Sequence, residues 1–140
     1  MKSNYIKFIL LFSILTSCST GLTKLPSGKE IDNALVGVWT GSEKGQQYEG
    51  VEKTWEMTRG NDGTFILNFK TIDEGESDEH TETGNWWIKN GKFYEFHDDS
   101  GKTDIYKYEV LDNNRIKFVS KNIKVSMNAE NYEFVDTRKN

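Results

Sequence analysis

Strict alternation of apolar and polar residues, interrupted by short turn sequences, is the feature that most constrains the fold of this chain. Residues 51–59 (VEKTWEMTR) place Trp55 and Met57 on one face and charged or hydroxylated side chains on the other. A period of two is typical of a half-buried β-strand. The turn sequence GNDG follows at 60–63, and residues 64–72 resume the alternation, so the two segments predict a β-hairpin.

The same alternation continues to the end of the chain. An Asn-Gly pair at residues 90–91, a strong hairpin signal, separates two further alternating segments. Eight segments are predicted to be strands joined mostly by tight turns: 35–41, 51–59, 64–72, 81–89, 92–97, 104–111, 115–120 and 132–138. Consecutive antiparallel strands form a meander, and eight of them can close into a barrel without exposed edges. The predicted fold class is therefore all-β, an antiparallel meander barrel of about eight strands.

Residues 122–128 (NIKVSMN) also alternate but stand outside this set. They are either a ninth strand or a continuation of the preceding strand past a β-bulge. Both interpretations are compatible with the alternation.

The first 17 residues are predicted to be a cleaved secretory signal rather than part of the fold. Lys2 and Lys7 make a cationic start, residues 8–15 (FILLFSIL) are an apolar run, and two small residues precede Cys18. This three-part layout is typical of a signal peptide. The apolar run is too short to span a bilayer, which takes about 20 residues.

Residues 15–18 (LTSC) resemble a bacterial lipobox, in which a leucine and two small residues precede an invariant cysteine. The resemblance implies that the Cys18 sulfur receives a diacylglyceryl group and that Cys18 becomes the lipidated N-terminus. Stable attachment to a membrane takes two or more acyl chains, such as palmitate. Cys18 is the only cysteine, so a disulfide within one chain is excluded. The alternatives are an ordinary secretory signal with an incidental thiol, or a buried free cysteine.

The residue after Cys18 and the charge balance bear on location and partners. Ser19 follows, and no acidic residue occurs before Glu30. In the lipoproteins that this segment resembles, that pattern implies the outer membrane of the bacterial envelope. The pattern does not fix the side of that membrane, and the periplasmic side is the predicted one. Of the 18 Lys and Arg residues, Lys2 and Lys7 lie in the signal, which leaves 16 basic against 22 acidic side chains. An acidic domain without a basic stripe is a poor nucleic-acid binder, so no nucleic-acid partner is predicted.

The remaining chain has room for one domain. Residues 18–30 are predicted to be the lipidated N-terminus and a flexible tether, because they are small, polar and interrupted by Pro26. Residues 28–35 (GKEIDNAL) could form a short helical turn. Residues 31–140 then make up the barrel domain.

At residues 37–39 (GVW) the chain resembles a lipocalin. Members of that family begin the first of their meandering strands with Gly-x-Trp after a short helical turn, and an arginine from near the end of the last strand packs across the indole. The resemblance implies that Trp39 and Arg138 close the base of the barrel. It covers roughly residues 31–138 and is closest to the small bacterial lipocalin-like lipoproteins, which also carry a lipobox.

A barrel interior lined by the aromatic and aliphatic residues of these strands would suit an apolar or amphipathic small molecule. The candidate ligand-binding residues are Trp55, Met57, Arg59, Phe65, Leu67, Phe69, Phe118 and Phe134. Lys53 and Arg59 share the parity of Trp55, so either could meet a ligand carboxylate if it points inward. The alternative is a barrel that its aromatic side chains pack shut.

Signals for catalysis and for metal binding are weak. The sequence has no GxSxG elbow, P-loop or HExxH motif, so no enzyme, cofactor or metal site is predicted. Residues 97–99 (HDD) could coordinate a metal, but a strand end that runs into a polar turn is the favoured interpretation. Residues 73–80 (DEGESDEH) offer oxygen ligands that would suit calcium, but their spacing matches no known loop. A solvated acidic loop over residues 73–82 is predicted instead.

Two functions follow from these observations. The leading hypothesis is a lipid-anchored envelope protein that binds a small apolar or amphipathic ligand without catalysis. The alternative is a protein-binding or inhibitory module that acts through an outer aromatic face or through the acidic loop. Adjacent Trp86 and Trp87 point to opposite faces of a strand, which supplies apolar surface outside the barrel as well as inside. Cover over Trp87 or Phe93 by loops or by the tether would remove that outer face.

Overall fold

The fold is described from a computed structural model, which covers residues 21–122 and 132–140. The described residues form strands and one 3-10 turn, η1 (Asn33–Leu35). The strands are β1 (Leu22–Lys24), β2 (Glu30–Asp32), β3 (Gly37–Lys44), β4 (Glu52–Arg59), β5 (Thr64–Asp73), β6 (Glu76–Lys89), β7 (Lys92–His97), β8 (Lys102–Asp112), β9 (Arg115–Asn122) and β10 (Glu133–Arg138). Cys18 and most of the alternating segment 122–128 lie outside the described residues.

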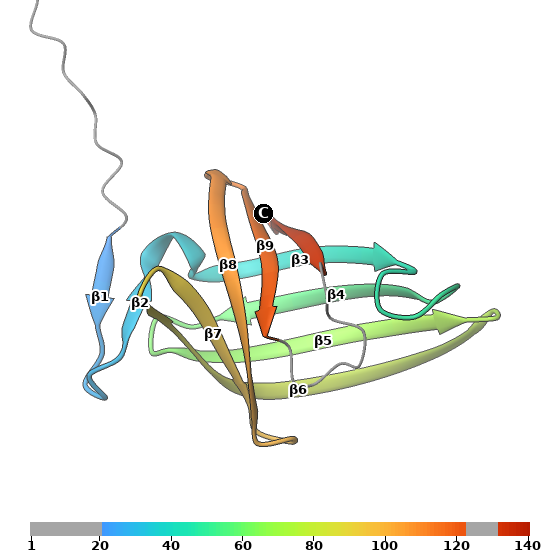
Figure 1. The fold of residues 1–140 in the computed structure, drawn as a ribbon, viewed down its shortest axis with the longest axis horizontal. Coiled ribbons are helices and arrows are strands. Elements are labelled where there is room, and N and C mark those ends of the chain that lie inside the picture. The colour runs from blue at the N-terminus through green and yellow to red at the C-terminus, as the bar shows by residue number, and fades with distance from the viewer. Residues whose placement is uncertain (1–20, 123–131) are drawn as a thin grey trace, which may run out of the picture.

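Strands β3 to β10 form a closed antiparallel barrel, which confirms the predicted fold class. Each strand from β3 to β10 pairs with the next one along the chain. Pairing of β10 with β3, through Thr137↔Thr40 and Arg138↔Trp39, closes the ring. Figure 1 shows β3, β4, β5 and β6 side by side in one curved layer, with β8 and β9 crossing them. The meander follows from the short turns, since such turns place consecutive strands beside each other.

The β6–β7 turn has the geometry that its Asn-Gly sequence predicts. Asn90 has φ 52° and Gly91 has φ 68°. Positive φ at both central residues characterises the type I′ turn, whose twist matches that of the flanking strands. The turn therefore fixes the register in which Lys89 faces Lys92 and Trp87 faces Tyr94.

Part of the predicted tether belongs to the folded domain, which corrects the prediction for residues 18–30. Strands β1 and β2 form an antiparallel hairpin, and Glu30 extends the sheet by pairing with Ile88 of β6. The turn between them contains Pro26 and Gly28, whose N–H donates to the Leu25 carbonyl at 2.9 Å. The hairpin is held in place because Ile31 is fully buried in the core.

The predicted acidic loop 73–82 is also corrected. Strands β5 and β6 stay paired from Thr64↔Asn85 to Asp73↔Glu76, and only Glu74 and Gly75 form the turn. The acidic side chains of residues 73–79 are exposed, as predicted, but they lie along a paired hairpin, whereas Glu82 is partly buried and lines the barrel interior. Alternation is absent here because both faces of this ribbon are polar and solvated, so the period-two pattern carries no signal.

One end of the barrel is closed by Trp39 and Arg138. Trp39 is fully buried, and its indole N–H donates to the Leu35 carbonyl at 2.9 Å. The Arg138 guanidinium lies 4.1 Å from the centre of the Trp39 ring. It also donates to the carbonyls of Ala34 at 3.1 Å and Val36 at 3.0 Å. The stacking that the lipocalin resemblance implied is therefore present. Arg138 also links β10 to the segment that precedes β3.

Gly37, the glycine of Gly-x-Trp, is needed for this closure. Its φ is 129°, and a Cβ there would lie 2.6 Å from Nη1 of Arg138. We expect Gly37→Ala to lower the free energy of unfolding by about 1–3 kcal/mol, because the change adds backbone strain and displaces the guanidinium. Urea unfolding followed by tryptophan fluorescence measures this loss.

Gly75→Ala is the matched control for Gly37→Ala. Gly75 has φ 87°, but a Cβ there meets nothing within 4 Å. The control carries only the backbone cost of a left-handed conformation, about 1–2 kcal/mol. A loss at Gly37 no larger than the loss at Gly75 would contradict the role assigned to Arg138.

Candidate functional site

The two ends of the barrel differ. Because the strands alternate in direction, the turns at 60–63, 90–91 and 113–114 lie at the end that Trp39 closes. The connections at 45–51 and 98–101 lie at the opposite end. Interior space therefore opens toward the second end, where Gln47 and Tyr48 of the 45–51 connection line it.

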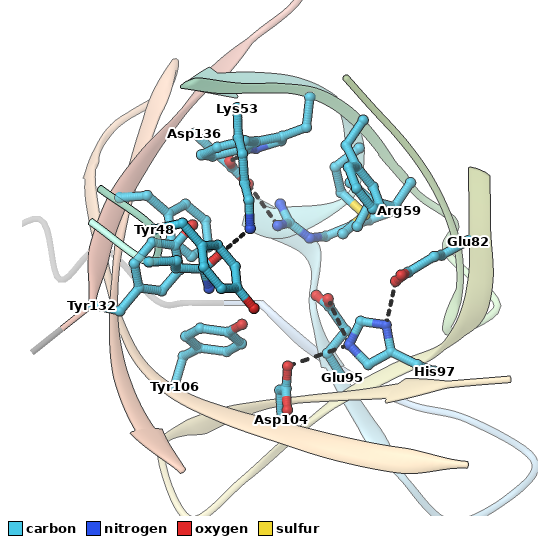
Figure 2. A pocket seen from close by; sticks show the side chains of 16 residues that line it. Tyr48, Lys53, Arg59, Glu82, Glu95, His97, Asp104, Tyr106, Tyr132 and Asp136 are labelled. Atoms are coloured by element: carbon cyan, nitrogen blue, oxygen red, sulfur yellow. Dashed lines mark hydrogen bonds and ion pairs between the residues drawn. The ribbon is translucent and has the colours of Figure 1, made fainter. Parts of the chain in front are cut away.

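A cavity of about 290 Å³ occupies the interior. Its volume lies near the lower end of the range typical of ligand pockets, about 300–1,000 Å³. The barrel is thus not packed shut by its aromatic side chains. Figure 2 shows polar side chains pointing into this cavity from several strands, among them Lys53, Arg59 and His97.

Six of the eight predicted ligand-binding residues line the cavity. They are Trp55, Met57, Arg59, Leu67, Phe69 and Phe134. Phe65 and Phe118 do not line it, although both point inward and are buried. Phe118 stacks on Phe134 with 5.0 Å between ring centres, so it packs against a side chain that lines the cavity. Lys53, which shares their parity, also lines the cavity.

Arg59 and Asp136 form a buried ion pair at the cavity. Nη2 of Arg59 lies 2.6 Å from Oδ2 of Asp136, and the side chains are 2% and 0% exposed. The Trp55 indole N–H donates to the other Asp136 oxygen at 2.9 Å. The guanidinium carbon lies 5.2 Å from the ring centre of Phe93 and 5.0 Å from that of Phe118. The guanidinium therefore lies close to two aromatic rings, and a carboxylate binds its Nη2.

Two nitrogens of Arg59 have no partner. Nε and Nη1 are buried and make no hydrogen bond to the described residues. An unsatisfied buried donor costs about 1–3 kcal/mol, and more when it is charged. These N–H groups are consequently able to bind an acceptor that enters the cavity.

His97 lies among three carboxylates on the other side of the cavity. Its Nδ1 is 2.7 Å from Glu82 Oε2, and its Nε2 is 3.3 Å from Glu95 Oε1 and 3.5 Å from Asp104 Oδ2. Burial lowers the pKa of His97, but the hydrogen bonds to Asp104 and Glu82 and the charge of Glu95 outweigh it and raise the pKa to about 10. The imidazole is therefore a cation at neutral pH.

Glu95 is a buried carboxylate with a raised pKa. Burial raises its pKa, while the charges of His97 and Arg59 oppose that rise, and the result is a pKa of about 7. Glu95 thus exists in both protonation states near neutral pH. Its side chain points into the cavity (Figure 2).

The sequence analysis did not identify this His97 cluster. Strand β7 ends at His97 and runs into a turn, as predicted for residues 97–99, but the side chain points inward. The available signal was parity, because Glu95 and His97 alternate in step with buried Phe93. A charged pair at inward positions of a strand was the sign of a polar interior.

Lys53 belongs to the outer part of the cavity. Its Nζ donates to the Gln47 side-chain oxygen and lies 5.2 Å from the centre of the Tyr48 ring. Burial lowers its pKa, and the charges of Glu43 and Glu82 oppose that effect. Tyr48 is 44% exposed, so this side of the cavity borders solvent.

The outer aromatic face is smaller than the sequence predicted. Trp86 is 1% exposed and points inward, whereas Trp87 points outward, as adjacent residues of a strand must. Trp87 stacks on Tyr94 with 5.4 Å between ring centres, and Nζ of Lys29 lies 3.7 Å from the Trp87 ring centre. The N-terminal hairpin therefore covers part of Trp87, and Phe93 is buried inside the barrel.

The described residues contain neither an arranged metal-binding group nor a membrane-spanning helix. Within residues 21–122 and 132–140, no group of three or more His, Cys, Asp or Glu side chains is arranged to hold a metal ion. The same described part of the chain contains no helix that is long and apolar enough to cross a membrane.

Comparison with known families agrees with the architecture. The model of the lipocalin-like domain matches residues 35–118, more than half of the chain. The chain belongs to this lipocalin-like family. The match begins just before the Gly-x-Trp segment and ends in β9. A search of the curated proteins finds no match to the sequence.

Proposed function

We propose that this lipocalin-like protein binds a small amphipathic ligand inside its barrel, without catalysis, while a lipid on Cys18 anchors it in the bacterial envelope. The observation that carries the binding function is the cavity of about 290 Å³ within a closed barrel. A lipocalin-like barrel suits ligand binding in general. Aromatic and aliphatic walls with a few convergent polar groups are typical of small-molecule sites.

The cavity supports an amphipathic rather than a purely apolar ligand. Trp55, Leu67 and Phe134 supply apolar wall, whereas Arg59 and His97 supply charge. A wholly apolar ligand would leave the unpaired N–H groups of Arg59 unsatisfied. A ligand with one polar end would satisfy them and still bury its apolar body.

The anchor is proposed from the sequence. The lipobox-like LTSC, placed after a cationic start and an apolar run, supports acylation at Cys18. The processed chain would then start a few residues before β1, which begins at Leu22. The outer membrane is the proposed location, because Ser19 follows the cysteine, and the domain is proposed to face the periplasm.

Filling the cavity tests the binding function. Leu67 lines the cavity, so we expect Leu67→Trp to occupy the space of the ligand and to weaken binding more than tenfold. The measurement is native mass spectrometry of the processed protein purified from its own host, which detects a retained small molecule.

Ile66→Trp is the matched control for Leu67→Trp. Ile66 is the preceding residue of β5, points outward and is 48% exposed. The control introduces the same side chain on the opposite face, so it leaves ligand retention unchanged. Retention by Leu67→Trp equal to that of the control would contradict binding in the cavity.

A further inference from the structure

The charged groups around the cavity are not equally free to meet a ligand. Asp136 already accepts from Arg59 and from the Trp55 indole. Glu82 and Asp104 both contact His97. Arg59, by contrast, keeps two buried nitrogens without a partner among the described residues.

The buried nitrogens at the cavity that have neither a hydrogen bond nor an ion pair to a described residue belong to one cationic group, Arg59: they are its Nε and Nη1. Nε2 of His97 also lacks a well-aligned hydrogen bond, but it lies within ion-pair distance of Glu95 and Asp104. The third buried side-chain group without a hydrogen-bond partner in the described chain, Oε1 of Glu43, does not line the cavity. Donors in a cationic group bind anionic oxygen most strongly, because the hydrogen bond and the charge interaction add. The site therefore favours a ligand oxygen that carries negative charge.

Glu95 is one of the carboxylates at the cavity that oppose such a ligand. It contacts His97 at 3.3 Å and points into the same cavity (Figure 2). When it is ionised, the cavity holds one more carboxylate than cations. The cations are Lys53 and Arg59 on β4 and His97 on β7, and the carboxylates are Glu82 on β6, Glu95 on β7, Asp104 on β8 and Asp136 on β10. The other titratable groups at the cavity are the tyrosines Tyr48, Tyr106 and Tyr132.

We propose that the ligand carries an anionic oxygen head group, such as a carboxylate, that binds the unpaired N–H groups of Arg59, and that Glu95 takes up one proton from solvent when this ligand binds. The inference rests on the proposed binding function and specifies its ligand class. Protonated Glu95 leaves the cavity with three cations against three carboxylates before the ligand enters. A neutral Glu95 also removes one of the like charges that would repel the incoming head group.

The pKa of Glu95 makes this proton uptake accessible. Its value of about 7 means that protonation near neutral pH costs little. A second negative charge in the cavity raises that pKa further. Anion binding is therefore strongest below pH 7 and weakens as the pH rises through 7. Above pH 7 the affinity falls by about tenfold per pH unit, as long as Glu95 stays protonated in the bound form.

The cavity volume limits the size of the ligand. A water molecule's share of liquid volume is about 30 Å³. The cavity of about 290 Å³ then has room for about ten non-hydrogen atoms. Octanoate has this size and one carboxylate, and octan-1-ol and octylamine are its neutral and cationic counterparts.

Calorimetry with these three probes tests the inference. The protein is the processed wild-type chain, and binding is measured at pH 6 and at pH 8.5. We expect octanoate to bind at least tenfold more tightly than octan-1-ol or octylamine at pH 6. We expect octanoate to bind about 30-fold more weakly at pH 8.5, from a pKa of about 7 and one linked proton. Binding heats at pH 7 should differ between buffers of different ionisation enthalpy in the sense of proton uptake.

Glu95→Gln tests whether protonation of Glu95 causes the pH dependence of octanoate binding. The amide has the shape of the protonated acid, so the variant is expected to bind octanoate at pH 8.5 as tightly as at pH 6. Glu79→Gln is the control, because that carboxylate lies on β6 with its side chain 77% exposed, and it should keep the wild-type pH dependence.

Three results would overturn the inference. Octan-1-ol or octylamine binding as tightly as octanoate would exclude the anionic head group, yet the cavity function would stand if Leu67→Trp abolished that binding. Unchanged pH dependence in Glu95→Gln would exclude Glu95 as the proton acceptor. Absence of octanoate binding, with another molecule retained in native mass spectrometry, would reject the ligand class and keep the proposed function.

Discussion

Replacing Trp39 with alanine is expected to lower the free energy of unfolding by about 3–5 kcal/mol. Trp39 is fully buried at the closed end of the barrel, where its indole donates to Leu35 and stacks under Arg138. Truncation removes the apolar contacts and leaves a cavity where η1, β3 and β10 meet. Chemical denaturation measured by far-UV circular dichroism gives the loss directly.

Arg138→Ala provides the comparison for this variant. The guanidinium makes a cation–π contact worth about 0.5–2 kcal/mol and hydrogen bonds to backbone carbonyls, of which Ala34 and Val36 are two. Its removal is expected to cost about 1–3 kcal/mol. A loss at Arg138 equal to or larger than that at Trp39 would contradict the assignment of the indole as the main closing group.

Replacing Cys18 with alanine is expected to abolish lipidation and membrane attachment completely. The proposed acyl chains are bonded through this residue, and the chain has no second cysteine to replace it. The measurement combines incorporation of radiolabelled fatty acid with partitioning into detergent. The variant should be unlabelled and should remain as an unprocessed precursor or be released.

Ser17→Ala serves as the control for Cys18→Ala. It keeps a small residue before the cysteine, so labelling and processing should be unchanged. Labelling of the Cys18 variant at the wild-type level would end the lipoprotein proposal. That result would leave the barrel and its cavity unaffected, because the described domain begins after the anchor.

Much of the fold could be predicted because strand alternation and turn chemistry are local properties. The hairpin of β4 and β5, the Asn90–Gly91 turn and the order of the strands follow from residues near one another in sequence. The β1–β2 hairpin could not be predicted in this way. Its three-residue strands are too short to show a period, and they are stabilised by burial of Ile31 against distant parts of the chain.

The sequence predicted which side chains point into the barrel but not which of them line the cavity. Parity alone shows that Trp55, Met57 and Phe65 point inward, and the structure agrees. Parity does not show depth along the barrel axis, so Phe65 was grouped with the cavity although it is buried without lining it. Depth depends on how far neighbouring strands are shifted along each other, which is a property of the closed barrel.

The class of fold, the strand directions, the inward residues and the Gly37–Trp39 signature can be predicted from local sequence, since each depends on the pleat or on a turn of a few residues. Which inward residues surround empty space depends on the closed barrel, as does the meeting of Arg59, Glu95 and His97 there from two separate strands. Barrel closure brings together charges that are far apart in the chain. Their burial, which sets the protonation of Glu95, exists only after that closure.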